Sequence, residues 1–329
     1  MKRRQVLCRV SGACLAMVPQ AASAQQAAKR PTIGLLLSES LEGQASRLTA
    51  LRAGLRERGY VEGRDIAIEI RSAAGDYDRL SRMAVELARL KVDVLVAFGS
   101  KATLAAKAAA SATPIVAPVL GDPAALGVTS NLARPDGNVT GSAILSVELF
   151  AKQIQLLKEL VPQTARVALL VNPANAASET QPMEEARHRA ANGLRIEFQR
   201  FNVRSSEQLA SAFAAIAKAR FDGVYVSADT LFRAQAGEVA RLAALWRLPS
   251  VGAREFADAG GLIGYGANDA ELHMRGTYFI DRLLSGARVG ELPIEQATRF
   301  DLVLNRRTAR SLGITISQSA LLRADEVIQ

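Results

Sequence analysis

Polar side chains that could hold a small ligand occur where predicted strands end and helices begin. Ser100 and Ser178 each combine a hydroxyl with the free backbone N–H groups of a helix N-terminus, which bind anions and carboxylates. Asp229 ends another strand, and its carboxylate could accept a hydrogen bond from an ammonium group. Tyr265, between two glycines, could line a cleft or pack against a hinge. The simpler interpretation of Ser100, Ser178 and Asp229 is that they cap the helices that follow.

Further candidates lie in equivalent loops. Ser38 follows the first predicted strand, Asp122 follows the fourth, and Asn175 belongs to the loop before the helix expected at 178–192. The carboxyl ends of parallel strands meet at one edge of a sheet, so we expect these side chains to face one cleft. The full set of expected ligand-binding residues is Ser38, Ser100, Asp122, Asn175, Ser178, Asp229 and Tyr265.

Residues that commonly carry catalysis or bind metals are few here. Neither a dinucleotide fingerprint, a P-loop nor a Gly-x-Ser-x-Gly elbow follows a predicted strand. The two histidines, His188 and His273, are most simply surface residues of helices. Asp76 and Asp78 could suggest a cation site but fit a helix cap better. We therefore expect no catalytic residue, no metal and no cofactor, which favours a binding protein over an enzyme.

Strand and helix patterns alternate along the chain. Apolar, β-rich runs predict strands at 32–37, 66–70, 92–98, 115–119, 167–171, 196–201, 223–226, 262–265 and 300–304. Helical patterns include 101–110, 146–160, 178–192, 233–246 and 269–285, with two short helices around Leu312 and Leu321. Capping boxes are expected at Ser205 with Gln208 and at Asn268 with Glu271. This alternation predicts parallel sheets with helices on both faces.

The pattern is interrupted where the chain is expected to cross between two lobes. Turn residues at 134–138 indicate one crossing, and Gly260-Gly261 indicates another. The predicted fold class is α/β, with two doubly wound lobes joined by a multi-crossing hinge and a ligand cleft between them. We assign residues 31–140 with 267–299 to lobe 1, and residues 141–266 with 300–329 to lobe 2.

The first residues have the pattern of an export signal. A basic stretch at 2–4 precedes an apolar stretch at 6–18 and the small-residue cleavage site Ala22-Ser23-Ala24. We therefore predict a signal peptide over 1–24 and a periplasmic location; Arg3-Arg4 also fits a twin-arginine signal. A buried N-terminal helix is the alternative. The apolar stretch is shorter than the roughly 20 residues that a membrane span needs.

Composition narrows the class of protein. The chain has 329 residues, 49% hydrophobic and 22% charged, as in ordinary globular proteins. Both cysteines, Cys8 and Cys14, lie in the predicted leader, so the mature chain would contain no disulfide. Loss of four basic leader residues would lower the formal charge from +9 to +5. The remaining Lys and Arg are scattered and only 5% of residues are aromatic, which argues against nucleic-acid binding.

Several segments carry a resemblance to a known family. They are Gly54–Gly63, Asp122-Pro123, Leu132–Gly141, Leu312-Gly313-Ile314 and Ala324–Ile328. On these segments the chain resembles the tryptophan/tyrosine-type substrate-binding proteins of ABC transporters, which have a type I periplasmic-binding fold. Asp136 departs from the pattern, because a glycine is common at that position.

The resemblance implies an exported, non-catalytic and monomeric receptor. It would close its lobes on a small solute, such as an amino acid or related carboxylate, and deliver it to an ABC permease in the inner membrane. Relatives bind aromatic amino acids, and by similarity the loops at Ser100, Asp122, 175–178 and Asp229 contact the ligand. Two alternatives stay open: an α/β hydrolase or isomerase, and a ligand-sensing module for a membrane receptor.

Overall fold

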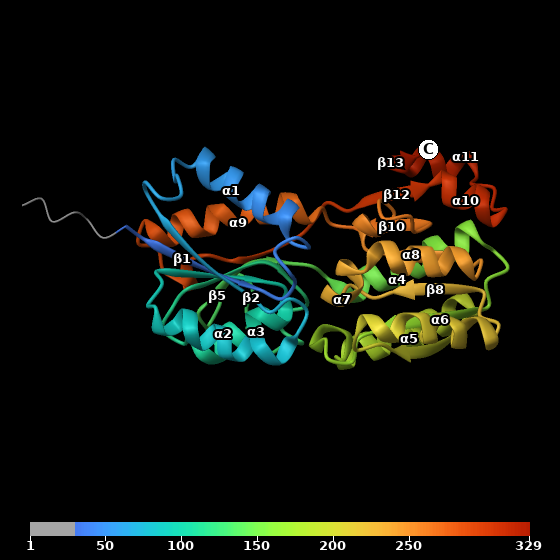
Figure 1. Cartoon of the computed structure of the whole chain (residues 1–329), viewed down its shortest axis with the longest axis horizontal. Coiled ribbons are helices and arrows are strands. Elements are labelled where there is room, and N and C mark those ends of the chain that lie inside the picture. The colour runs from blue at the N-terminus through green and yellow to red at the C-terminus, as the bar shows by residue number, and fades with distance from the viewer. Residues whose placement is uncertain (1–29) are drawn as a thin grey trace, which may run out of the picture.

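The computed structural model describes residues 30–329, which form two α/β lobes lying side by side along the long axis of the molecule (Figure 1). The predicted signal peptide at 1–24 lies outside the described residues. Within residues 30–329, no helix combines the length and the apolar character that crossing a membrane requires.

Lobe 1 contains a six-stranded sheet in the order β11-β5-β4-β3-β1-β2, in which every pair of neighbours is parallel. The strands are β1 (Thr32–Leu37), β2 (Ala67–Ser72), β3 (Val94–Phe98), β4 (Ile115–Leu120), β5 (Val139–Ala143) and β11 (Ile294–Gln296). Helices α1 (Ala45–Glu57) and α9 (Asp269–Leu284) cover one face of this sheet, and α2 (Tyr77–Arg89) and α3 (Ser100–Ala109) cover the other (Figure 1). The neighbouring strands β1 and β3 are buried between the two helix layers and are almost continuously apolar, whereas the edge strand β2 is half-exposed and carries polar residues.

Lobe 2 contains a seven-stranded sheet in the order β13-β12-β10-β9-β8-β6-β7, with only the β10–β12 pair antiparallel. The strands are β6 (Arg166–Val171), β7 (Glu197–Asn202), β8 (Gly223–Val226), β9 (Ser250–Gly252), β10 (Ile263–Gly266), β12 (Asp301–Asn305) and β13 (Glu326–Ile328). One core holds α4 (Ser146–Leu160), α5 (Gln181–Leu194), α10 (Arg306–Leu312) and α11 (Gln318–Arg323). The opposite core holds α6 (Leu209–Lys218) and α8 (Ala236–Leu245). The fold class predicted from the sequence is confirmed.

Short elements join these layers. The five-residue helix α7 (Thr230–Ala234) precedes α8, and four single 3₁₀ turns are η1 (Ala176–Ser178), η2 (Ser206–Gln208), η3 (Arg254–Phe256) and η4 (Val289–Glu291). The helix expected at 233–246 is therefore two helices, and the helix expected at 178–192 begins at Gln181. The strands β9, β11 and β13 were not predicted, because three residues are too few to show a period.

The described chain passes between the two sheets three times: after β5, after β10 and after β11. The expected crossing at Gly260-Gly261 is wrong, because it joins β9 to β10, which are neighbours in one sheet. The turn at 134–138 leads into β5 of lobe 1, so the boundary placed at 140/141 falls inside that strand. Gly141 has a φ of +137°, and a Cβ there would lie 2.0 Å from the carbonyl oxygen of Ala117. This close approach of β5 to β4 requires glycine.

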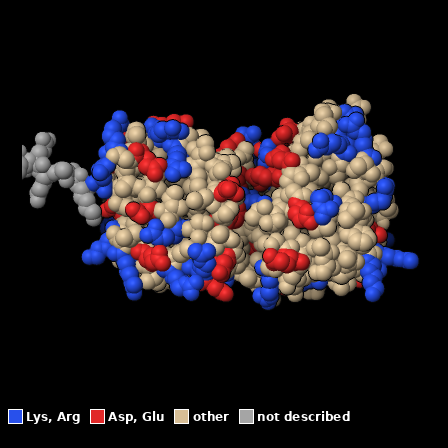
Figure 2. Space-filling model, viewed as in Figure 1, with Lys and Arg blue, Asp and Glu red and all other residues tan. Residues whose placement is uncertain are grey.

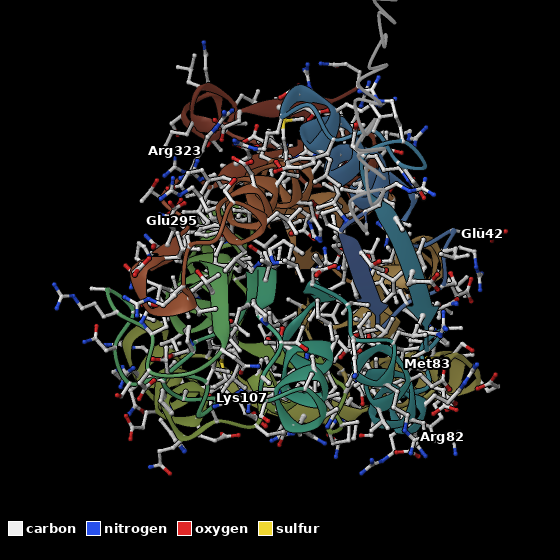
Figure 3. All side chains as sticks on the ribbon, turned by 90° about the vertical axis from the view of Figure 1, so that its left-hand side faces the viewer. Glu42, Arg82, Met83, Lys107, Glu295 and Arg323 are labelled. Atoms are coloured by element: carbon white, nitrogen blue, oxygen red, sulfur yellow. The ribbon has the colours of Figure 1, made fainter. Side chains whose placement is uncertain are left out.

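Basic side chains are spread over the surface of both lobes. Arg82, Lys107 and Arg323 come from α2, α3 and α11, and they lie well apart from one another (Figure 3). The basic residues that line the cleft, in contrast, are buried or half-buried, as described below.

Candidate functional site

A cavity of about 150 Å³ lies between the lobes and is lined from both of them. Figure 2 shows the groove at the junction of the lobes, with acidic side chains gathered along its rim. Lobe 1 contributes the carboxyl ends of β1, β3 and β4 and the first turns of α1, α3 and α9. Lobe 2 contributes residues of α4, α5, α7, η1, η3, β8 and β10. Six of the expected residues line the cavity: Ser38, Ser100, Asn175, Ser178, Asp229 and Tyr265.

Asp122 is the exception. It does not line the cavity, and its Oδ1 accepts hydrogen bonds from the backbone N–H groups of Ala124 and Ala125, at 3.0 and 3.1 Å. The carboxylate therefore closes the turn after β4. We correct the expectation that Asp122 contacts the ligand.

The N-terminus of α3 opens into the cavity. Its N-cap is Gly99, which has a φ of +91° and no side chain that could cap the helix. The hydroxyl of Ser100 does not cap it either, because this oxygen accepts a hydrogen bond of 2.9 Å from the backbone N–H of Gly121. The side chain of Lys101 also lines the cavity. Free N–H groups, the helix dipole and a nearby ammonium group together favour a carboxylate at this point.

Ser178 lies elsewhere than expected. It ends η1 rather than starting α5, whose N-cap is Thr180. Its hydroxyl donates a hydrogen bond of 2.9 Å to the carbonyl oxygen of Asn175. The side-chain oxygen of Asn175 in turn caps η1 by accepting a hydrogen bond from the N–H of Ala177. Its amide nitrogen donates a hydrogen bond of 3.0 Å to the carbonyl oxygen of Ala228. Ser178 thus stabilises the loop that lines the cavity, and the expected role at a helix N-terminus is wrong.

Asp229 both caps a helix and joins the lobes. Its Oδ1 accepts hydrogen bonds from the backbone N–H of Leu231 and from Nδ2 of Asn172, at 2.9 and 3.1 Å. Its Oδ2 accepts a bond of 2.8 Å from the hydroxyl of Tyr77, which belongs to the other lobe and also contacts Thr230. Only 3% of Asp229 is exposed, and burial raises the pKa of its carboxyl above the usual value.

Five charged residues form a second connection between the lobes, which we call the interlobe ion cluster. In lobe 1, Arg47 contacts Glu39 at 3.2 Å and Asp269 at 3.1 Å. From lobe 2, Arg233 reaches across to the same Asp269 at 2.7 Å and also contacts Glu255 at 3.3 Å. All five residues line the cavity.

Protonation within the cluster follows from burial and pairing. Burial raises the pKa of Glu39 and of Glu255, and the nearby arginines offset this effect only in part. Burial also opposes ionisation of Asp269, but Arg233 and Arg47 outweigh it and hold the pKa of that carboxyl below its usual value. With all five groups ionised, three carboxylates face two guanidinium groups, so the cluster carries one excess negative charge. It is therefore suited to a cationic group on a ligand.

The remaining wall of the cavity is largely apolar. Its larger apolar and aromatic side chains are Phe98, Val119, Leu120, Ile144, Leu149, Met183, Tyr225 and Tyr265. Burial raises the pKa of the Tyr225 phenol to about 12, so this group stays protonated and can donate a hydrogen bond. The side chain of Gln153 stabilises this wall by donating hydrogen bonds to the carbonyl oxygens of Gly252 and Tyr265, at 2.9 and 2.7 Å. A flat apolar group would fit this wall.

One cavity residue contradicts the expectation of a surface position, and a second was not singled out from the sequence. His273 is only 2% exposed, and Arg187 only 6%. The guanidinium group of Arg187 donates a hydrogen bond of 3.0 Å to the carbonyl oxygen of Ser178. Helical spacing could have identified both residues: Arg187 is four residues after the buried Met183, and His273 is seven before the buried Ile280.

Within residues 30–329, no cluster of three or more His, Cys, Asp or Glu residues is arranged to hold a metal ion. The expected cap role of Asp76 is confirmed, because its side chain accepts a hydrogen bond from the N–H of Asp78.

Comparisons with known proteins identify the family. A family model described as "ABC transporter substrate binding protein" matches residues 39–328. A tyrosine-binding protein of Clostridioides difficile (strain R20291) is 24% identical over 262 residues, covering 79% of this chain and 74% of the relative.

Solved structures show the same fold. A conserved domain protein from Vibrio cholerae aligns with a TM-score of 0.84 and 25% identity over 91% of this chain and all of that one. A Streptococcus pneumoniae ABC domain in complex with L-Trp aligns with a TM-score of 0.83 and 24% identity, again over 91% of this chain and all of that chain. The ligand-free, open form of a Clostridium difficile substrate-binding protein aligns with a TM-score of 0.63 and 21% identity. The alignment covers 91% of this chain and 99% of that one. The family model spans both lobes and the cleft between them, and the chain therefore belongs to the family of ABC transporter substrate-binding proteins.

Proposed function

We propose that this chain is the exported solute receptor of an ABC importer, and that it binds an α-amino acid with an aromatic side chain without converting it chemically. The observation that carries this proposal is the composition of the interlobe cavity. A free helix N-terminus, buried carboxylates and an apolar wall are the three surfaces that an aromatic amino acid needs.

The geometry suggests a partner for each part of the ligand. The carboxylate would accept hydrogen bonds from the N–H groups at the start of α3, beside Ser100 and Lys101. The ammonium group would bind the remaining acceptor capacity of Asp229 and the excess negative charge of the interlobe ion cluster. The ring would pack against Phe98, Tyr225 and Tyr265.

The relatives support the ligand class and the conformation. One is named a tyrosine-binding protein, and another was solved with L-Trp bound. The present lobes are held together by direct contacts, and the chain aligns better with the L-Trp complex than with the ligand-free, open structure, at TM-scores of 0.83 and 0.63. We therefore take the described arrangement to be the closed form that binds ligand.

A thermal-shift screen followed by calorimetry tests the proposal. We expect L-Trp, L-Tyr or L-Phe to stabilise the protein, by about 2.7 kcal/mol at 100 times the dissociation constant. Tryptamine lacks the carboxylate and indole-3-propionate lacks the ammonium group, so both should bind far more weakly than L-Trp. Equal binding of either analogue would contradict the assigned partner, and chemical conversion of a bound amino acid would indicate an enzyme.

Asp229→Ala tests the ammonium partner. We expect it to weaken binding of the amino acid at least tenfold, because a charge-assisted hydrogen bond contributes about 1.5–3 kcal/mol. Asp122→Ala is the matched control, since that carboxylate closes a turn outside the cavity. If Asp229→Ala bound the ligand as tightly as the parent, Asp229 would not hold the ammonium group.

Export and assembly are part of the same proposal. We infer that residues 1–24 direct the protein to the periplasm, where it acts as a monomer and docks on its permease. Cell fractionation should recover a processed form in the periplasmic fraction, and size-exclusion chromatography with light scattering should give the monomer mass. A full-length cytoplasmic protein or a stable dimer would contradict these parts.

A further inference from the structure

The cavity extends into lobe 2 between α4, α5 and the end of β8. Leu149 and Gln153 are four residues apart on α4, and Met183 and Arg187 are four residues apart on α5, so each helix presents one face to the cavity. Tyr225 of β8 completes this part of the wall. We call these five residues the lobe 2 subsite.

The hydroxyl of Tyr225 is a polar group of this subsite that has no partner. Only 7% of the residue is exposed, and its hydroxyl makes no hydrogen bond within residues 30–329. Its oxygen is not one of the unpartnered side-chain atoms that are sealed from solvent, so it faces open space, and the space that Tyr225 lines is the interlobe cavity. Phe150 packs edge-on against the ring, with centroids 5.0 Å apart, and fixes its orientation. The phenol is therefore a positioned hydrogen-bond donor.

Gln153 supplies an acceptor in the same subsite. Its Nε2 donates to the carbonyl oxygens of Gly252 and Tyr265, and because a carbonyl oxygen can only accept, this pair of bonds fixes which end of the amide is the nitrogen. Oε1 consequently points away from them. It makes no hydrogen bond to any described residue and, like the Tyr225 oxygen, it is not sealed, although only 5% of Gln153 is exposed.

These two groups lie beside each other over the sheet of lobe 2. Tyr225 is in register with Val251 on β9, and Gly252, to which Gln153 is bonded, is the next residue of that strand. Neighbouring strands are about 4.8 Å apart. Tyr225 and Gln153 form no hydrogen bond with each other, so one group placed between them could contact both. A hydroxyl is suited to this place, because it accepts from one partner and donates to the other.

We propose that the lobe 2 subsite binds a hydroxyl group on the aromatic ring of the ligand, and so selects L-tyrosine over L-phenylalanine. Tyr225 donates to the phenolic oxygen of the ligand, and Oε1 of Gln153 accepts a hydrogen bond from it. The inference rests on the proposed function, because it assumes that an aromatic amino acid occupies the cavity. A ring without the hydroxyl leaves both buried groups unpaired, and a site built to bind a hydroxyl rejects an analogue that lacks it for this reason.

The test compares L-Tyr with L-Phe, which differ only in the hydroxyl. Calorimetry on the purified full chain should show about tenfold tighter binding of L-Tyr. Tyr225→Phe removes one oxygen and keeps the ring against Phe150, so the preference should fall to within about threefold, with affinity for L-Phe kept. A crystal structure of the L-Tyr complex should place the phenolic oxygen about 2.8 Å from the Tyr225 hydroxyl and from Oε1 of Gln153.

Tyr278→Phe is the matched control, because it removes a phenol hydroxyl from α9 outside the cavity and should leave both affinities unchanged. Equal binding of L-Tyr and L-Phe by the parent would overturn the inference and leave the proposed function standing. So would a preference that Tyr225→Phe does not reduce, or binding of L-Trp without binding of L-Tyr. A parent that bound none of the three amino acids would reject the proposed function, and this inference with it.

Discussion

The hydroxyl of Tyr77 donates a hydrogen bond of 2.8 Å to Oδ2 of Asp229, and this bond joins α2 of lobe 1 to the start of α7 in lobe 2. The two residues are 152 positions apart in the sequence. Because the bond spans the cleft, it exists only while the lobes are closed. Closure of the lobes therefore depends on the hydrogen bond that the Asp229 carboxylate accepts from Tyr77.

Tyr77→Phe should weaken ligand binding about tenfold, mainly through faster dissociation. The variant leaves the buried Asp229 with one partner fewer in the closed form, at a cost of about 1–3 kcal/mol, and costs little in the open form. Stopped-flow dissociation measurements would show the effect. Tyr60→Phe is the control, because Tyr60 makes a similar bond of 2.9 Å to Asp281 within lobe 1. If both variants changed dissociation equally, the interlobe bond would have no special role.

Arg233→Met should shift the ligand-free protein toward an open form. Removing this guanidinium group leaves Asp269, Glu39 and Glu255 with only Arg47 in the closed state, and breaking a buried pair in this way costs about 3–5 kcal/mol. Small-angle X-ray scattering should report a larger radius of gyration, and affinity should fall by at least a hundredfold. Arg241→Met removes an exposed partner of Glu238 and should change neither. An unchanged radius in Arg233→Met would contradict the role of the cluster in closure.

His273 should make the protein less stable in mild acid. Its pKa falls from 6.5 to about 4 on folding, so below pH 6.5 the unfolded chain takes up a proton that the folded one refuses. The free energy of unfolding is therefore unaffected by this group above pH 6.5 and decreases as the pH falls from 6.5 to 4, by about 3 kcal/mol in total. Urea unfolding of His273→Phe should lack this component of the pH dependence, whereas His188→Phe should retain it. Parallel curves for parent and His273→Phe would show that the ring is not neutral and buried.

Gly264→Ala should destabilise the protein and displace the part of the cavity wall formed by β10 and η3. A Cβ on Gly264 would lie 2.2 Å from the backbone carbonyl oxygen of Arg254, so β10 and η3 would have to separate. Such overpacking costs about 1–3 kcal/mol of unfolding free energy, and it would move Tyr265 and Glu255 at the cavity. Gly193→Ala, which meets open space in α5, should cost nothing in the same denaturation assay. Equal stability of the two variants would argue against tight packing of β10 on η3.

Local patterns were sufficient to predict most of the strands and the region of the site. The apolar run Thr32–Leu37 and the helix at 146–160 coincide with β1 and α4, and six of seven expected residues line the cavity. The positions agree because strand ends and helix starts depend on neighbours in the sequence; that these residues bind a ligand stays a prediction. The tryptophan/tyrosine-type family resemblance is likewise confirmed.

Contacts between the lobes were not predictable from local patterns. Arg233 and Asp269 belong to different lobes and are 36 residues apart, and nothing near either residue distinguishes them from solvated helix charges. Ser178 was placed at a helix start because the one-turn η1 has no signature of its own. The interlobe ion cluster and the role of Tyr77 required the folded chain, since they arise where two separately patterned lobes meet.

The three crossings between the sheets also constrain the order in which the protein can be assembled. The buried residues of lobe 1 include Phe279 and Ile280 of α9 and Ile294 of β11, which follow five of the seven strands of lobe 2 in the chain. During synthesis, the first five strands of lobe 1 therefore emerge long before the helix that covers them. Domains that are continuous in sequence can fold as soon as they emerge, but this lobe cannot. Its apolar surface stays uncovered until translation is nearly complete, so a chaperone has that whole interval in which to bind it.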